Sequence, residues 1–164
     1  IAVDDRDRIA RMASIYDAGL EDYVRSLGSA TGANYAGAGV PGFERVGASV
    51  QHLRDHLREV PILVVPVFAG RTEDASTFFQ ASLWGSIVQA VWSFMLALRT
   101  RGLGSCWTTG HLQREQEMAE LLGIPGQHFT QVGLFPVAYT RGSGFKRAWR
   151  RPVSEVLRWN HFEG

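Results

Sequence analysis

A long run without charged side chains constrains this chain more than any other feature. Residues 75–98 contain no Asp, Glu, Lys or Arg, although 20% of the chain is charged, and charges and glycines return directly afterwards in LRTRGLGSCWTTGH. The pattern predicts a helix, a sharp glycine turn and a short buried strand. Its length would also admit a transmembrane span, for which about 18 apolar residues without charge are the usual sign.

Small and polar residues mark one side of this predicted helix. Ser82, Ser86, Gln89, Ser93 and Ala97 recur every three or four positions, while bulky apolar residues occupy most of the others. A helix that is apolar nearly all round is typical of the centre of a soluble core. We therefore predict a buried core helix whose small-residue face lets another backbone or a flat ligand come close.

Composition favours one soluble domain. A chain of 164 residues can bury about 70% of the surface of its unfolded state. The net charge of +1 lacks the basic excess of nucleic-acid binders. The single cysteine, Cys106, excludes an intrachain disulfide and suits a reducing compartment, so we expect a cytoplasmic protein and an inert buried thiol. The chain starts with IAVDD, without a signal-peptide pattern, and we expect a missing N-terminal segment before it.

The rest of the chain predicts alternating helices and strands in one domain spanning residues 1–164. Apolar residues at helical spacing predict helices over 4–28 and 43–60, and the glycine-rich stretch 28–42 predicts a connector or a lid. Apolar runs predict interior strands over 61–68, 105–109 and 128–139. A short helix over 112–122 should end at Gly123. This order indicates an α+β or α/β sandwich with a mainly interior sheet.

Histidine and serine patterns do not indicate a hydrolase. His52 and His56 lie four residues apart, but Leu53 stands where the zincin pattern needs a glutamate. A solvated helix face is the simpler interpretation of the two histidines. The chain also lacks the Gly-x-Ser-x-Gly nucleophile elbow.

The predicted strand 105–109 ends in Trp107, Thr108, Thr109 and Gly110. GLGSCWTTG lacks the third glycine of the dinucleotide fingerprint and leads from a helix into a strand, so a classical nicotinamide site is not indicated. Gly110 could let a backbone N–H approach a planar ligand closely. It could also simply end the strand, and the residues alone favour this second interpretation.

A basic loop covers residues 141–151. Lys146, Arg147 and Arg150 belong to it, and arginines in such a cluster can bind a phosphate with two hydrogen bonds each. The alternative is a solvated charge run. RNA binding is not favoured, because the patch is short and the whole chain is nearly neutral.

The ordered segments PILVVPV, LALRTRGLGSCWTTG, MAELLGIPGQH, VGLFPVAYT and RRPVSEVLRW resemble the C-terminal two-thirds of an FMN-dependent nitroreductase, over roughly residues 61–159. The resemblance implies an α+β fold, a nitroreductase-like α/β sandwich with a central mixed sheet and a buried core helix. It implies homodimers that exchange terminal segments, with FMN in two equivalent interface sites. It also implies reduction of nitroaromatics, quinones or similar acceptors with NAD(P)H.

The resemblance also implies roles for particular residues. Residues 107–110 would line one face of the isoalloxazine, with the N–H of Gly110 or Thr109 aimed at flavin N5. Such a hydrogen bond to a charged group is worth about 1.5–3 kcal/mol. Arg150, two residues before Pro152, matches the phosphate-binding arginine of the family, and Lys146 and Arg147 are weaker candidates.

Two departures from the family pattern leave alternatives open. The Arg-rich start and the Ser/Asn segment that contact FMN in the family are absent, and Thr109 stands where many members have Glu. The chain could therefore sequester a flavin without turnover, or carry out another flavin reaction such as reductive dehalogenation. The acceptor and the choice between NADH and NADPH stay open.

Overall fold

The computed structural model describes residues 1–29, 44–142, 144 and 147–162, so most of the loop predicted over 28–42 lies outside the described residues. The helices predicted over 4–28 and 43–60 are confirmed. The elements in chain order are β1(Ala2–Val3), α1(Arg6–Ser29), α2(Glu44–His56), η1(Leu57–Glu59), β2(Ile62–Val64), β3(Val67–Ala69), α3(Thr77–Arg99), β4(Leu103–Ser105), η2(Gly110–Arg114), α4(Glu115–Leu122), β5(Phe129–Gln131), β6(Phe135–Tyr139) and α5(Val153–Val156).

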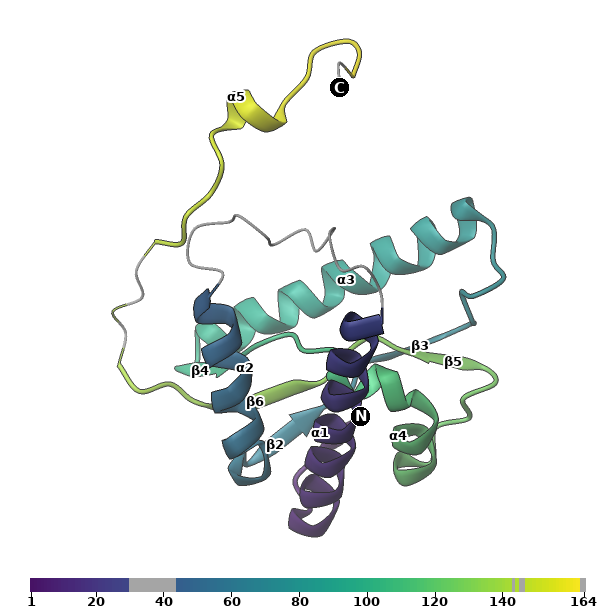
Figure 1. Ribbon diagram of the computed structural model, residues 1–164, viewed down its shortest axis with the longest axis vertical. Coiled ribbons are helices and arrows are strands. Elements are labelled where there is room, and N and C mark those ends of the chain that lie inside the picture. Colours follow the sequence, from purple (N-terminus) through teal and green to yellow (C-terminus); the bar gives the residue numbers. More distant parts are fainter. Residues whose placement is uncertain (30–43, 143, 145–146, 163–164) are drawn as a thin grey trace.

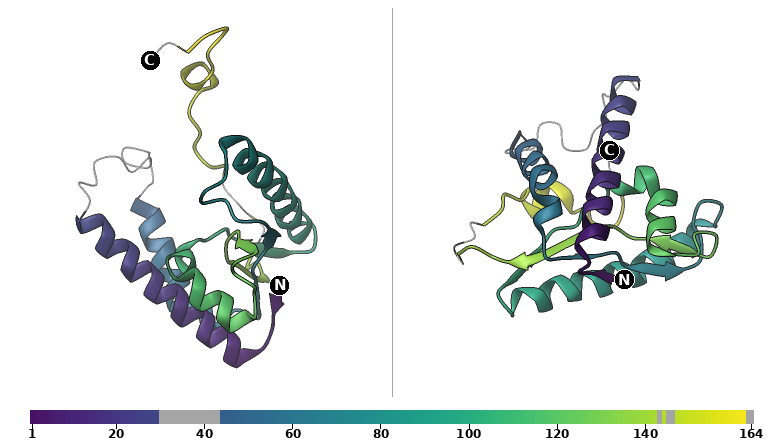
Figure 2. Two further views of the ribbon diagram at one scale, coloured as in Figure 1. Left: turned by 90° about the vertical axis from the view of Figure 1, so that its right-hand side faces the viewer. Right: turned by 90° about the horizontal axis from the view of Figure 1, so that it is seen from below.

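Helices cover both faces of the strands (Figures 1 and 2). A four-stranded sheet has the order β1-β2-β6-β4, and β3 pairs with β5 in a second, two-stranded sheet. The helices α1, α2 and α4 lie on one side and α3 lies on the other. This arrangement confirms the α+β class and the sandwich. The pairings between the described strands are all antiparallel, so the expected mixture with parallel pairs is not found among them.

A β-bulge separates the two sheets. Val64 pairs with Phe135 and Val67 pairs with Gln131, so residues 65–66 face residues 132–134, two positions against three. Pro66 has no N–H, but its carbonyl accepts a hydrogen bond from the Val132 amide at 3.0 Å. The predicted strands 61–68 and 128–139 therefore exist as extended chain, but each is divided between two sheets.

The bulge also keeps the sides of the sheet consistent. Leu63 and Leu134 face the cluster beneath α1, whereas Val64 and Phe135 face α3. Beyond the bulge Val132 faces α3, although it is an even-numbered position like Leu134. The extra residue thus shifts the alternation of side chains by one position in segment 132–134, so that β5 stays in phase with β3.

The first long helix is well enclosed. Ile9, Met12 and Tyr16 of α1 are buried completely or almost completely, and they pack with Leu63 and Met118 in the larger core cluster. They recur every three to four residues, which places them on one face of α1. This face explains why the sequence folds there, since its burial is the main source of stability for an amphipathic helix.

The second long helix is not enclosed within the described chain. Val91 and Leu98 are its buried residues, whereas Phe78 is 81% exposed and Trp92 is 60% exposed. The prediction of a helix buried on all sides is therefore wrong for the single chain. By length and composition α3 could cross a membrane, yet one side packs on the sheet through Val91. Its predicted small-residue face is exposed and comprises Ser82, Ser86, Gln89, Ser93 and Ala97.

The strand after α3 lies earlier than the sequence predicts. β4 ends at Ser105, and Thr108 forms only an isolated antiparallel bridge with Leu134. The chain then turns into the 3-10 helix η2, so the predicted helix 112–122 begins inside a tighter turn. Gly123 ends α4 with a φ of 67°, as expected for a glycine that ends a helix in the left-handed region.

Candidate functional site

The segment 107–110 lies between the sheet and α1, and its tryptophan faces inward. The Trp107 indole N–H donates to the Val132 carbonyl at 3.1 Å, and its ring lies 5.3 Å from the ring of Phe135. A Cβ on Gly133 would lie only 2.4 Å from the indole nitrogen, so the bulge glycine makes room for the ring. Trp107 therefore offers a ligand its backbone, while its side chain belongs to the core.

Helix α1 holds the residues on both sides of Thr109. The hydroxyl of Thr108 donates to the Tyr16 oxygen at 2.9 Å. A Cβ on Gly110 would lie 2.8 Å from the Tyr16 ring, and one on Gly19 would lie 2.2 Å from the Gly110 carbonyl oxygen. Both glycines are thus required by close helix packing. For Gly110 the structure shows contact with α1 at the place where the sequence suggested a ligand.

Thr109 is the exposed member of this segment. Its carbonyl accepts a hydrogen bond from the Leu112 amide at 2.9 Å. Its own N–H donates no hydrogen bond to any residue that the structure describes. An N–H without a protein acceptor, in an exposed residue whose neighbours are fixed on both sides, is suited to a ligand atom that gains negative charge.

A cavity of about 370 Å³ lies beside this segment. Its walls are mainly apolar, and Arg45 is its charged member. Burial raises the pKa of the Cys106 thiol and of the Tyr16 hydroxyl, so both groups are kept in their neutral forms at neutral pH. The residue Cys106 is nevertheless exposed, so its thiol is only partly desolvated and is not buried as the sequence predicts. The lining residues are Tyr16, Arg45, Val46, Ser49, Val50, Leu53, Cys106, Trp107 and Thr108.

A buried polar cluster follows directly after the segment. His111 is 0% exposed, and neither of its ring nitrogens has a partner among the described residues. Burial lowers the pKa of His111 to about 4, against smaller opposite effects of Glu115 and of the nearby Gln131 side chain, which does not reach hydrogen-bond geometry with the ring. The Gln131 side chain donates to the Glu115 carbonyl at 2.9 Å, and Arg71 pairs with the Glu115 carboxylate at 2.9 Å. The cluster ties α4 to β5 behind the candidate site.

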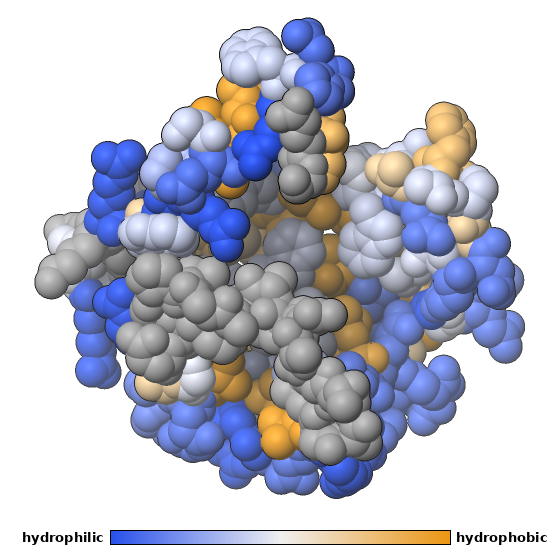
Figure 3. Space-filling view, turned by 45° about the horizontal axis from the view of Figure 1, so that its top comes forward, coloured by the Kyte–Doolittle hydropathy of each residue, from blue (hydrophilic) through white to orange (hydrophobic). Residues whose placement is uncertain are grey.

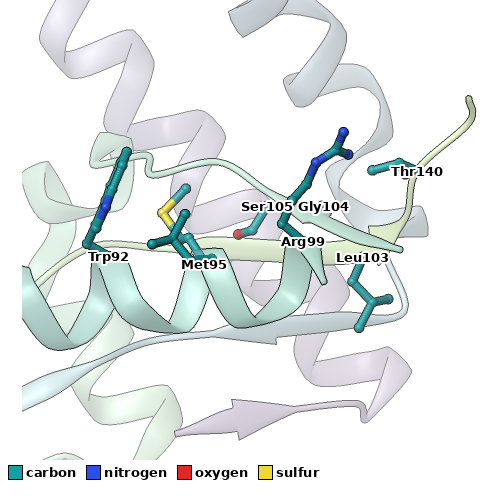
Figure 4. Close-up of a pocket in the computed structure, with 8 residues that line it drawn as sticks. Trp92, Met95, Arg99, Leu103, Gly104, Ser105 and Thr140 are labelled. Atoms are coloured by element: carbon teal, nitrogen blue, oxygen red, sulfur yellow. The ribbon is translucent and has the colours of Figure 1, made fainter. Parts of the chain in front are cut away.

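A second cavity, of about 290 Å³, lies between α3 and the edge strand β4 (Figure 4). Trp92, Met95 and Arg99 line it from the helix, and Leu103 and Ser105 line it from the strand. The Ser105 hydroxyl is buried and has no partner among the described residues. This cavity continues the exposed apolar side of α3.

The predicted phosphate-binding residues lie away from segment 107–110. Arg147 and Arg150 are exposed on the C-terminal tail, which projects from the body (Figures 1 and 2). Arg150 donates to the neighbouring Trp149 carbonyl at 2.8 Å. Lys146 lies outside the described residues. Figure 3 shows hydrophobic patches on the tail and in the hollow behind it. The exposed apolar side chains of the tail include Val153, Val156, Leu157, Trp159 and Phe162.

The histidine pair on α2 is exposed. The rings of His52 and His56 lie 4.5 Å apart, and His56 faces Glu59 with 3.1 Å between Nδ1 and the carboxylate. No cluster of at least three His, Cys, Asp or Glu side chains that could hold a metal ion occurs in the described part of the chain.

Comparison with known proteins assigns the family. A model of the Nitroreductase family matches residues 6–139. The chain belongs to the Nitroreductase family. A search of curated protein sequences finds no match.

Solved structures of similar fold are distant in sequence. An oxidized iodotyrosine deiodinase bound to FMN and 3-iodo-L-tyrosine superposes with a TM-score of 0.64 at 18% identity, over 99% of this chain and 75% of that one. A BluB-like flavoprotein from Clostridium difficile 630 superposes with a TM-score of 0.62 at 16% identity, over 97% of this chain and 77% of that one. The FMN and NADPH-dependent nitroreductase NfnB from Sphigopyxis sp. strain HMH superposes with a TM-score of 0.60 at 14% identity, over 99% of this chain and 79% of that one. At these identities the likeness shows the nitroreductase fold.

Sequence reasoning missed Tyr16 and Gly19. Tyr16 occupies an ordinary apolar position of a helix, and its partner Thr108 is 92 residues away. The one local signal was a glycine inside a helical pattern, which often marks close packing.

Proposed function

We propose that this protein is an FMN-dependent oxidoreductase that passes hydride or electrons from NAD(P)H to a nitroaromatic, a quinone or a similar small acceptor. The observation that carries the proposal is the N–H of the exposed residue Thr109, which lacks an acceptor among the described residues and directly follows Thr108, a residue that lines a mainly apolar cavity. Membership of the Nitroreductase family and the flavin-bound structures of similar fold support it.

Within one chain, the residues of segment 107–110 are suitably placed for the flat ring of FMN, whereas the tail arginines are less suitably placed for the phosphate of FMN. We assign the Thr109 N–H to the ring nitrogen that exchanges hydride, and the backbone of Trp107 and Thr108 to one face of the ring. The chemistry that FMN supplies when bound is hydride and electron transfer, while the protein supplies orientation and electrostatics. Arg150, with Lys146 and Arg147 as weaker candidates, is assigned to the phosphate.

A second copy of the chain completes this proposal. The exposed face of α3 combines small residues with Phe78 and Trp92, a surface that suits close packing of a second helix. The described part of the exposed tail carries Arg150 and six large apolar residues, and we propose that it lies on the partner subunit in a homodimer. Each FMN would then be held by both subunits. A single cysteine agrees with the cytoplasm as the compartment.

The absorbance spectrum of the purified protein tests the proposal. We expect a yellow protein after incubation with FMN, and bleaching when NADH or NADPH is added without oxygen. A protein that stays colourless after incubation contradicts the proposal. A yellow protein that neither donor bleaches would instead indicate a flavin-sequestering protein. Assays with nitroaromatics, quinones, enones and halogenated aromatics then identify the acceptor.

Paired substitutions in the tail test the phosphate assignment. Arg150→Gln should weaken FMN binding by about tenfold or more, since a hydrogen bond to a charged group contributes about 1.5–3 kcal/mol. Arg158→Gln, in the same exposed tail, is the matched control and should leave the dissociation constant unchanged. Flavin fluorescence quenching measures both constants. Equal constants for the two variants would remove Arg150 from the site.

A further inference from the structure

Arg45 is the charged side chain of the cavity beside segment 107–110. It lies in the first turn of α2, is exposed, and lines the mainly apolar cavity of about 370 Å³. Trp107 and Thr108 line the same cavity, and the proposed function assigns their backbone to one face of the flavin ring. A molecule that fills the cavity can therefore contact both the Arg45 guanidinium and the segment beside the flavin.

The hydroxyl and indole groups of the cavity already have partners. The Ser49 hydroxyl donates to the Arg45 carbonyl at 2.9 Å, a bond within α2. The Thr108 hydroxyl donates to the Tyr16 oxygen at 2.9 Å, and the Trp107 indole N–H donates to a backbone carbonyl at 3.1 Å. Among the nitrogen and oxygen groups of the lining side chains, the Arg45 guanidinium is thus the one without a partner in the described chain.

Arg45 has no acidic partner among the residues that the structure describes. Arg54, near the other end of the same helix, pairs with Asp17 and Glu21 of α1. The residues three and four positions after Arg45, which share its face of α2, are uncharged, and the stretch 30–43 before α2 contains neither Asp nor Glu. The positive charge at the cavity is therefore not neutralised by the described chain.

We propose that the acceptor is an aromatic carboxylate, whose ring occupies the apolar part of the cavity and whose carboxylate pairs with Arg45. This inference rests on the proposed function, because the cavity lies beside the segment assigned to the flavin. Val46, Val50 and Leu53 supply apolar contacts for the ring. A carboxylate in a mainly apolar site is unfavourable without a cation, and a guanidinium can hold it with two hydrogen bonds. A neutral aromatic acceptor would gain the apolar contacts alone.

Two nitro compounds of similar shape test the inference. 4-Nitrobenzoate is ionised at neutral pH, since a carboxyl group has a pKa of about 4, whereas 4-nitrobenzamide is neutral. In Arg45→Gln the ratio of kcat/KM for the benzoate to kcat/KM for the benzamide should fall about tenfold relative to wild type, as expected for loss of a hydrogen bond to a charged group. Comparison of this ratio between proteins cancels the different reactivity of the two nitro groups.

Two further variants control for charge alone. Arg58→Gln removes the same charge from an exposed residue just after α2 that does not line the cavity, and it should keep the wild-type ratio. Arg45→Lys keeps the charge but loses the two parallel hydrogen bonds, so its ratio should lie between those of wild type and Arg45→Gln. Calorimetry without a hydride donor measures the binding of both nitro compounds, and the dissociation constants should change in the same order.

FMN and NADPH also carry phosphates, which are anions that a guanidinium can bind. In Arg45→Gln the dissociation constant of FMN and the preference between NADPH and NADH should stay at their wild-type values. If Arg45→Gln instead weakened FMN binding or the preference for NADPH, and the ratio for the two nitro compounds stayed unchanged, the cation would serve the cofactor or the donor. The inference would then be wrong.

The remaining outcomes separate this inference from the proposed function. If the protein binds FMN and is bleached by NAD(P)H, but Arg45→Gln and Arg58→Gln show the same ratio and the same binding of both compounds, the proposed function stands and the inference is wrong. If the protein takes up no FMN, the proposed function fails and the assignment of the acceptor fails with it. A loss for 4-nitrobenzoate that is confined to the Arg45 variants supports the inference.

Discussion

The two long helices of this protein use their apolar residues in opposite ways. α1 carries many charges, yet it buries Ile9, Met12 and Tyr16 almost completely. α3 has no charge before Arg99, yet it leaves Phe78 and Trp92 mostly exposed. Apolar content alone therefore does not tell which helix the chain itself encloses.

The two helices differ in the surfaces that they contact. The buried face of α1 meets the sheet, η2 and α4 of the same chain, and two glycines allow the close approach. One side of α3 meets the sheet, while its small-residue face meets nothing that the structure describes. We interpret α1 as a helix for the core of one subunit and α3 as a helix for the contact between two.

The largest effect is expected in the core beneath α1. Ile9→Ala should lower the free energy of unfolding by about 2–5 kcal/mol, because it leaves a cavity in a fully buried site. Leu96→Ala on the exposed side of α3 should act only through association, so its effect should vary with protein concentration. Chemical denaturation at several concentrations measures both. If Leu96→Ala lowered the free energy of unfolding by the same amount at every protein concentration, the distinction between the two helices would be wrong.

Acid should loosen the junction of α1 with η2. An unfolded chain protonates His111 near its ordinary pKa of 6.5, but burial lowers the pKa in the folded chain to about 4. Between these values the unfolded state binds more protons, so stability falls as the pH falls, by about 3 kcal/mol in total. Denaturation curves from pH 7 to pH 4 measure the slope. His111→Gln should remove this contribution, and an unchanged slope in the variant would contradict the burial of a neutral ring.

A charge on the small-residue face of α3 should prevent dimer formation. Ser86→Arg should weaken association by about 100-fold or more, equivalent to about 2.7 kcal/mol, since a bulky cation would be desolvated between two helices. Ala10→Arg, on the exposed side of α1, is the matched control. Sedimentation analysis gives the two dissociation constants. A Ser86→Arg protein that dimerises as well as the Ala10→Arg protein would show that this face is free.

The smallest effect sharpens the same comparison. A Cβ on Gly85 of α3 or on Gly47 of α2 would meet nothing within 4 Å, so each Gly→Ala change should stabilise the single chain by about 1 kcal/mol. Gly85→Ala should also weaken association, because the methyl group would separate two closely packed helices. Gly47→Ala should not. Denaturation at low protein concentration measures the stability of the single chain, and sedimentation measures association. Identical behaviour of the two variants would count against close helix packing at Gly85.

The sequence predicts the helices and their ends well, because these depend on local chemistry. Helical spacing locates α1 and α2, and Gly123 ends α4 as expected. The division of the strands was not predicted. It depends on how Pro66 and Gly133 oppose each other across the sheet, and that register is a property of two segments far apart in the chain.

Segment 107–110 stays a prediction as a flavin site, and its arrangement could not be predicted from the sequence. The glycine after two threonines indicated where a backbone could meet a ligand. The inward turn of Trp107 depends on the space at Gly133, and Thr108 is held by hydrogen bonds with both Tyr16 and Leu134. The exposure of α3 was missed because an apolar pattern predicts burial without telling which chain provides it.

The bulge opposite Pro66 also limits how the chain can vary in length. Loss of one residue from 132–134 would make the two segments equal and the pairing continuous, and the side chains of β5 would keep their present faces. Buried Thr130 and Gln131 would then stay on their present sides. Deletion of Gly133 should nevertheless be tolerated less well than a deletion of the same size in the exposed tail, because Gly133 makes room for the Trp107 ring.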